Sequence, residues 1–538
     1  MALPLGHQIS GAAFTGSTVV RPSPVWIRTM IEDVAPAPAE LEIKFKLPAG
    51  AETKLAAHPA LRSETGKGVK ARHEVTTYFD TANRDLARRG ATLRVRVGSK
   101  GRVQTLKLRD DGDSLFGRGE WEWPLESNTP DPAKLAATPL ASLLDKLEVL
   151  GPVFTTEVDR TVRTLRLDDA EIETAIDIGA IRAGEAVEEI RELELELKGG
   201  KVAALYKLAT QLGAELQLTL GVESKADRGW RLSTGHTRTP EKAGDILLPS
   251  KVTTAEAIRR IVGMTLANLL ANLPAAAAGR IEGVHNMRIA IRRLRTALAL
   301  FQPYLDKATT ARFTEGLRQL GRVLGEARDW DVFCTETLAA AAEAGVAEEL
   351  LNDLRGPAAI ERTRAHASLG AALAGPPLTA LVLELAAWVE DPAALAGSPD
   401  GGDLHTPLAD LVPKLEERLE RKARRRGRHI RRRSAEELHD LRKSLKKLRY
   451  GVEFLAPLHR RKQVRAFLHG CKALQQHLGT MNDAAVAETL VKRLGAGREA
   501  ELARTAGTLG SWAERRRTEA HRHLRHAWHG FKATSLPN

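Results

Sequence analysis

The stretch Glu40-Leu41-Glu42-Ile43-Lys44-Phe45-Lys46 alternates charged and apolar residues without interruption. Successive side chains of a β-strand point to opposite faces, so this period of two predicts a strand with one charged and one apolar face. The same alternation recurs at residues 93–97, 106–109, 118–123, 171–177 and 192–198, and less regularly at 73–80 and 156–167. The first half of the chain is therefore predicted to form about eight strands of an antiparallel sheet.

The charged faces of these strands carry both signs, with the cations and the carboxylates largely on different strands. An open sheet with one solvated face would explain any single strand. Taken together, the strands favour a sheet closed into a barrel, lined by cations on some walls and by carboxylates on others. Helices such as residues 202–212 would then cover the apolar outer face. Such a lumen suits a polyphosphate held by the cations and Mg²⁺ or Mn²⁺ held by the carboxylates.

The ordered set of motifs resembles the CYTH superfamily, the triphosphate tunnel metalloenzymes, over residues 38–232. Glu40-Leu41-Glu42-Ile43-Lys44 is similar to the ExExK signature of that family. The match continues at residues 78–81, 93–96, 105–107, 118–122, 177–179, 192–196 and 224–229. This resemblance implies an eight-stranded antiparallel tunnel that binds a triphosphate and hydrolyses a terminal phosphoanhydride bond.

The resemblance also implies roles for the residues that match. The implied metal ligands are Glu40, Glu42, Glu194 and Glu196, with Glu192 on the same strand face as an alternative. The implied phosphate ligands are Lys44, Arg94, Arg96, Lys107, Arg118 and Lys225. Arg160 and Asp177 are expected in the lumen, as a further phosphate ligand and a further metal ligand. Glu120 and Glu122 would bind a second metal or balance charge.

Phosphoryl transfer depends mainly on positioning and on neutralising oxygen charge. Cations and a metal ion would supply both effects in such a lumen. No Walker loop competes for this role, because Gly66-Lys67 lacks the upstream glycine and the following serine or threonine of that motif.

Composition limits what the whole chain can be. Its 538 residues allow about three or four domain-sized units, and 43% hydrophobic with 28% charged residues exclude a disordered chain. Lysine and arginine exceed aspartate and glutamate by 81 − 68 = 13, which favours a polyanionic partner. Two cysteines, Cys334 and Cys471, exclude a disulfide framework, so a cytoplasmic protein is expected. The chain has no run of eighteen apolar residues, so no membrane span or membrane partner is expected.

The composition changes near residue 230, where alanine, leucine and arginine begin to recur at helical spacing. Thr253 and Glu256 are typical of a capping box that begins a helix. Residues 1–37 are expected to be a disordered leader, with Met30 as an alternative start. The tunnel domain is assigned to residues 38–232, a linker to 233–252, a first helical repeat to 253–396, a second linker to 397–407 and a second helical repeat to 408–532.

Two segments of the helical half repeat at a constant offset. Residues 285–295 align with 439–449, and Asp329 aligns with Asp483, so that 439 − 285 and 483 − 329 both equal 154. At helical spacing each repeat places one histidine and three cations on a single face. These residues are His285, Arg288, Arg292 and Arg295 in the first repeat, and His439, Arg442, Lys446 and Arg449 in the second. A solvated basic face would explain either helix alone, but the repetition favours a ligand surface.

The repeat resembles the CHAD domain over residues 253–532, through its two His-x-x-Arg helices and the segments 324–329 and 478–483. The resemblance implies two four-helix bundles related by a pseudo-twofold axis. It also implies a basic groove or pore that binds inorganic polyphosphate, including polyphosphate granules. From local sequence, Gly325 and Gly479 are each predicted to end a helix, and Asp329 and Asp483 to cap the next.

The densest basic segment, residues 421–449, holds 14 lysines and arginines against 3 acids. Such a cluster would attract nucleic acid non-specifically. It contains no tyrosine, phenylalanine or tryptophan that could stack on a base, so specific nucleic-acid binding is not expected.

The sequence as a whole predicts an α+β multidomain protein. An N-terminal eight-stranded antiparallel β tunnel with flanking helices would precede a C-terminal all-α pair of pseudo-twofold four-helix bundles. The predicted function is metal-dependent hydrolysis of inorganic triphosphate in the tunnel, with binding of inorganic polyphosphate by the helical half. The alternatives are a CYTH-type adenylate cyclase, a nucleoside or thiamine triphosphatase, and a non-catalytic polyphosphate-binding protein.

Overall fold

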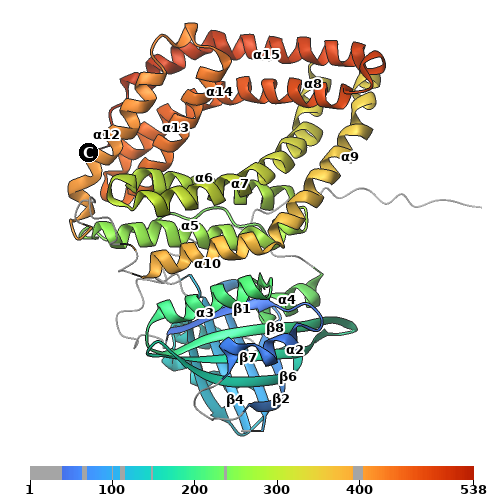
Figure 1. The fold of residues 1–538 in the computed structure, drawn as a ribbon, viewed down its shortest axis with the longest axis vertical. Helices are drawn as coiled ribbons and strands as arrows, with labels where there is room; N and C mark the ends of the chain where they lie inside the picture. Colours follow the sequence, from blue (N-terminus) through green and yellow to red (C-terminus); the bar gives the residue numbers. More distant parts are fainter. Residues whose placement is uncertain are drawn as a thin grey trace, which may run out of the picture.

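The computed structural model of the protein describes residues 39–537, apart from residues 63–68, 100, 110–114, 147–148, 236–238, 392–394 and 396–403. The predicted leader and most of the predicted second linker therefore lie outside the described residues. Figure 1 shows a β unit, coloured blue to green, beneath a larger helical unit, coloured green to red.

The N-terminal half is one antiparallel sheet with the strand order β5-β4-β3-β2-β6-β7-β8-β1-β9. The strands are β1 (Ala39–Lys46), β2 (Lys70–Asp80), β3 (Ala91–Gly98), β4 (Gly101–Arg109), β5 (Gly117–Leu125), β6 (Gly151–Leu167), β7 (Ala170–Ala183), β8 (Ala186–Gly199) and β9 (Thr219–Leu220). β1 pairs with β8, and its first three residues also pair with β5. β5 is the first strand of this order and β1 is close to its other end. Their short contact therefore brings the two edges of the sheet together, and the eight long strands surround one lumen.

The apolar faces of the alternating strands point outward. Ile43 and Phe45 of β1 are fully buried in a core that they share with Leu205 and Leu212 of α3 (Val202–Glu215). The charged faces point inward, where ion pairs join strands that are distant in sequence. The predicted antiparallel tunnel with helices on its outer face is therefore confirmed.

Tight turns fix the register of the longest strands. Asp168 and Asp169, with φ of 46° and 62°, form the two-residue turn between β6 and β7. Left-handed conformations at both turn residues match the twist of the flanking strands. As a result, Arg160 lies directly opposite Asp177 on the inner face.

The C-terminal half is all helical, as predicted. Its helices are α5 (Thr254–Ala277), α6 (Ile281–Phe301), α7 (Lys307–Val332), α8 (Leu338–Glu343), α9 (Glu348–Leu373), α10 (Pro376–Glu390), α12 (Leu408–Arg426), α13 (Ala435–Leu455), α14 (Arg461–Gly495) and α15 (Glu499–Ala533). Thr253 caps α5 by accepting a hydrogen bond from the Glu256 N–H. α6 and α13, which carry the repeated cations, lie side by side near the middle of this half.

Two predicted helix ends are wrong. α7 continues through Gly325 and Asp329, and α14 continues through Gly479 and Asp483. Tertiary contacts override the local signal, because Asp329 accepts a hydrogen bond from Arg288 of α6 at 2.9 Å instead of capping a helix.

No single helix among the described residues combines the length and apolar composition needed to cross a membrane. The pair α9 and α10, bent by 51°, meets both criteria, but by length and composition only.

Candidate functional site

Strand register brings the charged residues of the tunnel together. On the inner face, Lys44 of β1 lies opposite Glu194 of β8, and Glu42 lies opposite Glu196. On the adjoining wall, where β5 pairs with β1, Lys107 of β4 lies opposite Glu120 of β5. Directly opposite side chains on one face are close enough to interact, so the sequence-predicted residues form connected networks.

The innermost network centres on Lys225. Its Nζ lies 2.8 Å from Asp177 Oδ2, 2.8 Å from Glu192 Oε2 and 2.7 Å from Glu194 Oε1. Lys225 is the first residue of α4 (Lys225–Thr234), and the capping box of Ser224 and Asp227 fixes the start of that helix. Burial opposes the charge of Lys225, but these three carboxylates raise its pKa well above the ordinary value.

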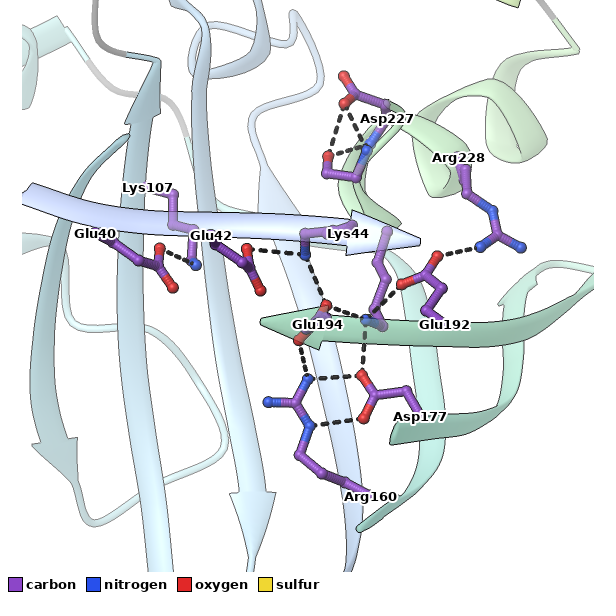
Figure 2. Close-up of polar contacts among 12 residues, drawn as sticks. Glu40, Glu42, Lys44, Lys107, Arg160, Asp177, Glu192, Glu194, Asp227 and Arg228 are labelled. Carbon is purple, nitrogen blue, oxygen red and sulfur yellow. Dashed lines mark hydrogen bonds and ion pairs between the residues drawn. The ribbon is translucent and has the colours of Figure 1, made fainter. Parts of the chain in front are cut away.

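Arg160 and Lys44 complete this network (Figure 2). Arg160 donates two hydrogen bonds to Asp177, at 2.8 and 2.6 Å, and a third to Glu194 at 2.6 Å. Lys44 Nζ lies 2.6 Å from Glu194 Oε1 and 3.1 Å from Glu42 Oε2. Burial alone would raise the pKa of Glu194, but Lys225, Lys44 and Arg160 hold it well below the ordinary value. Glu194 is therefore ionised and neutralised by these three cations.

A second network lies along β1, β4 and β5. Lys107 Nζ is 2.5 Å from Glu40 and 3.3 Å from Glu120. Arg94 and Arg96 of β3 reach Glu120 and Glu122 at 3.4 and 3.2 Å. The backbone of Arg118 pairs with that of Glu40, but the Arg118 side chain lies outside the described part of the chain.

Glu196 is held in a different electrostatic environment. Burial and the charges of Glu40 and Glu42 raise its pKa to about 7, although Lys198 hydrogen-bonds to it. Glu40, Glu42 and Glu196 are therefore close enough to repel one another, and each is held by a lysine. Neighbouring carboxylates of this kind can hold a divalent cation.

Two carboxylate sets can thus be compared as metal sites. Asp177, Glu192 and Glu194 each place one oxygen within 4.8 Å of the others, but the Lys225 ammonium is already bonded to all three. Glu42 lies opposite Glu196 by register, and Glu40 lies two residues before Glu42 on the same face of β1. Each of these three carboxylates is paired with a different lysine. Both sets offer oxygen donors that suit Mg²⁺ or Mn²⁺, and among the described residues the first set brings its three oxygens closest together.

The structure adds lumen residues that sequence reasoning missed. Glu74 of β2 is buried and lies 3.9 Å from both Arg72 and Arg160. Arg72 and Glu74 share one face of β2 with Thr76 and Tyr78. Of the intervening His73, Val75 and Thr77 only Val75 is apolar, so the period of two was weak in the sequence. Arg228, one helical turn beyond Lys225, donates to Glu192 at 2.5 Å.

The helical half contains a second cluster of cations. Lys446 of α13 is half-buried, and burial together with Arg292, Arg442, Arg288 and Arg449 lowers its pKa to about 6. Arg288 is held by the Asp329 side chain and, at 3.2 Å, by the Gly325 carbonyl. The two predicted stripes therefore converge, and we call these five residues the basic groove.

The two histidines of the stripes lie beside the groove, and Arg295 does not join it. The pKa of His285 is lowered by burial and by Arg328, Arg292 and Arg288. His439 Nδ1 lies 2.8 Å from Asn482 Oδ1. Arg295 points elsewhere, because its charged neighbours are Arg318 and Glu315.

Several half-buried arginines of the two stripes have a buried Nε atom. Within the described part of the chain, the Nε atoms of Arg292, Arg295, Arg442 and Arg449 are buried and have no hydrogen-bond partner. Buried donors without partners are rare in folded proteins. Arg449 Nε lies 3.2 Å from Glu453 Oε1 without forming a hydrogen bond, so a donor remains unsatisfied at each of these positions.

Comparison with known proteins agrees with this division of the chain. Residues 38–230 match the family model of the CYTH domain, and residues 260–492 match that of the CHAD domain. An inorganic triphosphatase of Haemophilus influenzae is 34% identical over 163 residues, which are 29% of this chain and 45% of that protein.

Two further similarities concern larger parts of the chain. An uncharacterized protein of Mycobacterium tuberculosis is 32% identical over 272 residues, 47% of this chain and 51% of that protein. The crystal structure of the CHAD domain from the plant Ricinus communis, 27% identical, covers 56% of this chain and 99% of that chain with a TM-score of 0.49. The chain spans about half the length of the curated relatives it matches. It carries a CYTH domain, which forms the β tunnel, followed by a CHAD domain, which forms the helical half.

Proposed function

We propose that the CYTH domain hydrolyses inorganic triphosphate to diphosphate and phosphate with a divalent cation, and that the CHAD domain binds inorganic polyphosphate. The observation that carries the first part is the lumen itself, where Lys44, Lys107, Arg94 and Arg160 converge on buried carboxylates. The similarity to an inorganic triphosphatase supports the same substrate class.

The lumen cations would bind the substrate by exchanging partners. Lys107 and Lys44 now contact Glu40 and Glu42. Phosphate oxygens would replace these carboxylates as partners of the two lysines and free Glu40 and Glu42, with Glu196, to hold a divalent ion. When bound, that ion would neutralise phosphate oxygen charge and lower the pKa of a water molecule.

The inner network would act as a rigid base for this exchange. Asp177 and Glu194 fix the Arg160 guanidinium through three hydrogen bonds, and Lys225 is fixed by three carboxylates. Side chains held in this way present their charge with little reorganisation, which favours positioning of a phosphoryl group.

The surroundings of the lumen favour an inorganic substrate over a nucleotide. Among the described residues, Phe79, Trp121 and Trp123 belong to one outer core cluster, whereas Tyr78 and Phe154 lie on the inner face, stack on each other and are buried. Neither set offers an exposed ring in the lumen on which a base could stack. The same observation argues against adenylate cyclase activity.

Polyphosphate binding by the CHAD domain is supported by the basic groove. Arg292, Arg442 and Arg449 each keep a buried Nε without a hydrogen-bond partner, and crowding like charges is costly unless a ligand supplies the opposite charge. A phosphate polymer supplies that charge without requiring recognition of a base.

A direct assay tests the catalytic proposal. Phosphate release is measured with inorganic triphosphate, ATP, thiamine triphosphate and long-chain polyphosphate, each with Mg²⁺ or Mn²⁺ and with a chelator. The highest kcat/KM is expected for inorganic triphosphate, with no release in the chelator. Faster turnover of ATP or thiamine triphosphate would indicate a nucleoside or a thiamine triphosphatase instead. No turnover of any substrate would indicate a non-catalytic polyphosphate-binding protein.

A further inference from the structure

Helix α10 of the CHAD domain lies against the tunnel, between α5 and α7 on one side and α3 on the other (Figure 1). Its side chains do more than fill the interface. Two of them, Thr379 and Glu390, each accept a hydrogen bond from a backbone N–H of the CYTH domain. Both of these N–H groups lie next to a residue that is bonded to β1.

The first contact is near the C-terminal end of β1. Thr379 is buried, and its Oγ1 accepts from the Leu220 N–H at 3.2 Å. The following N–H, that of Gly221, donates to the carbonyl of Lys44 at 2.8 Å. A Cβ at Gly221 would lie 3.3 Å from the Lys44 Cβ, so glycine permits this close approach. Leu220 also pairs with Phe45 in the β1–β9 ladder.

The second contact is near the N-terminal end of β1. Glu390 Oε1 accepts from the Leu115 N–H at 2.9 Å. The next residue, Phe116, accepts a hydrogen bond from the Glu42 N–H at 3.4 Å through its carbonyl. Immediately after it, Gly117 begins the three-residue pairing of β5 with β1. The Phe116 ring lies 6.3 Å from that of Tyr206, whose pKa is raised by burial and by Glu390.

These contacts lie on the side of β1 that has the shorter backbone pairing with neighbouring strands. The pairing with β8 extends over six residue pairs, from Leu41 to Lys46. On its other side β1 has only the three-residue contact with β5 and the two-residue contact with β9. α10 holds both of these short contacts, through Glu390 at one and Thr379 at the other.

We propose that α10 is a clamp on β1, and that Thr379 and Glu390 are positioning residues for the carboxylates of Glu40 and Glu42. Through this clamp, a helix of the CHAD domain helps to hold the strand that carries Glu40 and Glu42. The role assigned to Glu40 and Glu42 rests on the proposed function, whereas the mechanical contact of α10 with β1 does not.

The test uses the full chain and paired substitutions on α10. Thr379→Val and Glu390→Leu nearly preserve side-chain size and remove the hydrogen-bond acceptor. Thr379→Ser and Glu390→Gln keep an acceptor at each position. Glu384→Leu is the matched control, because Glu384 lies on the same helix but pairs with Arg312 of α7 at 2.5 Å.

The first readout is amide hydrogen exchange, which does not depend on activity. In the Thr379→Val, Glu390→Leu double variant, amides of residues 39–47 should exchange at least about tenfold faster, while those of β6 and β7 keep their rates. The Thr379→Ser, Glu390→Gln variant should restore slow exchange. Unchanged exchange in β1, or equal acceleration of all strands, would overturn the clamp.

The second readout is Mn²⁺ affinity, measured by calorimetry on the same proteins. Displaced ligand carboxylates should weaken Mn²⁺ binding by about tenfold in the valine–leucine variant and leave it unchanged in Glu384→Leu. An unchanged Mn²⁺ affinity in the valine–leucine variant would contradict the positioning role. If that double variant does not fold, Thr379→Val and Thr379→Ser provide the same comparison singly.

The two proposals fail in different ways. Fast exchange in β1 with weakened Mn²⁺ binding, but no triphosphate hydrolysis by the unsubstituted protein, would support the clamp and reject the proposed function. Hydrolysis by a valine–leucine variant that has normal exchange and normal Mn²⁺ affinity would reject the clamp and support the function.

Discussion

Glu42 sits where the lumen networks meet. Its carboxylate contacts Lys44 at 3.1 Å and lies opposite Glu196. Glu42→Gln keeps the shape but removes a negative oxygen, so turnover of inorganic triphosphate with Mn²⁺ should fall at least about a hundredfold. Glu157→Gln is the control, because Glu157 is an exposed glutamate of β6 that pairs with His73 and Arg182.

The comparison is made on proteins with matching circular dichroism spectra. Near-normal turnover of the Glu42→Gln variant would show that the divalent ion is held elsewhere in the lumen. The buried set of Asp177, Glu192 and Glu194 would then become the leading site.

Lys446 makes the stability of the CHAD domain depend on pH. Its pKa is about 6 in the folded protein against an ordinary 10.5, so between these values the unfolded chain binds a proton that the folded chain lacks. The free energy of unfolding should therefore rise with pH across this window, by up to about 1.4 kcal/mol per unit from this one group. Urea unfolding at pH 7 and pH 9 measures the rise.

The matched variant is Lys446→Met, which keeps the length of the side chain and cannot bind the proton. Its unfolding free energy should rise less between the two pH values than that of the unsubstituted protein. The same rise in both proteins would mean that Lys446 is not crowded by Arg292, Arg442, Arg288 and Arg449.

At the scale of elements, α6 and α13 form one binding surface from two copies of a repeat. Reversing charge in one copy, Arg288→Glu with Arg292→Glu, should weaken binding of long polyphosphate about tenfold or more, and adding Arg442→Glu with Lys446→Glu should abolish it. Titration with polymers of defined length at two salt concentrations measures both the affinity and its salt dependence.

Exposed cations of α15 provide the control for total charge. Arg515→Glu with Arg525→Glu changes the net charge equally without touching the basic groove. If this pair weakened polyphosphate binding as much as the α6 pair does, the polymer would be bound by net charge alone.

The elements differ in how far sequence could predict them. The alternation at residues 40–46 and 192–198 was sufficient to predict that each strand has one charged face and that this face points inward, because a strand has a strict period of two. The contact of Lys44 with Glu194 joins residues 150 positions apart, and it depends on the pairing of β1 with β8, which no local signal in the sequence reports. The helix ends at Gly325 and Gly479 were predicted wrongly, since no local signal reports the contact of Arg288 with Asp329.

At the scale of the whole molecule, the two domains share one hydrophobic core. Leu205 and Leu212 of α3 and Val382 and Leu383 of α10 belong to the same buried cluster. Domains joined by a large apolar interface should unfold together. Calorimetry of the full chain is expected to show a single cooperative transition, whereas two separate transitions would indicate an interface too weak to couple the domains.

The paired lining of the tunnel has a consequence for selectivity. An anion that enters alone must separate Lys107 from Glu40 and Lys44 from Glu42, and it leaves two carboxylates without counterions in a water-poor space. An anion that enters as a chelate of a divalent metal replaces both partners in one exchange. Orthophosphate, sulfate and chloride bring no such metal with them. The tunnel is therefore expected to bind a chelate of a polyphosphate anion with a divalent metal more tightly than it binds a free anion.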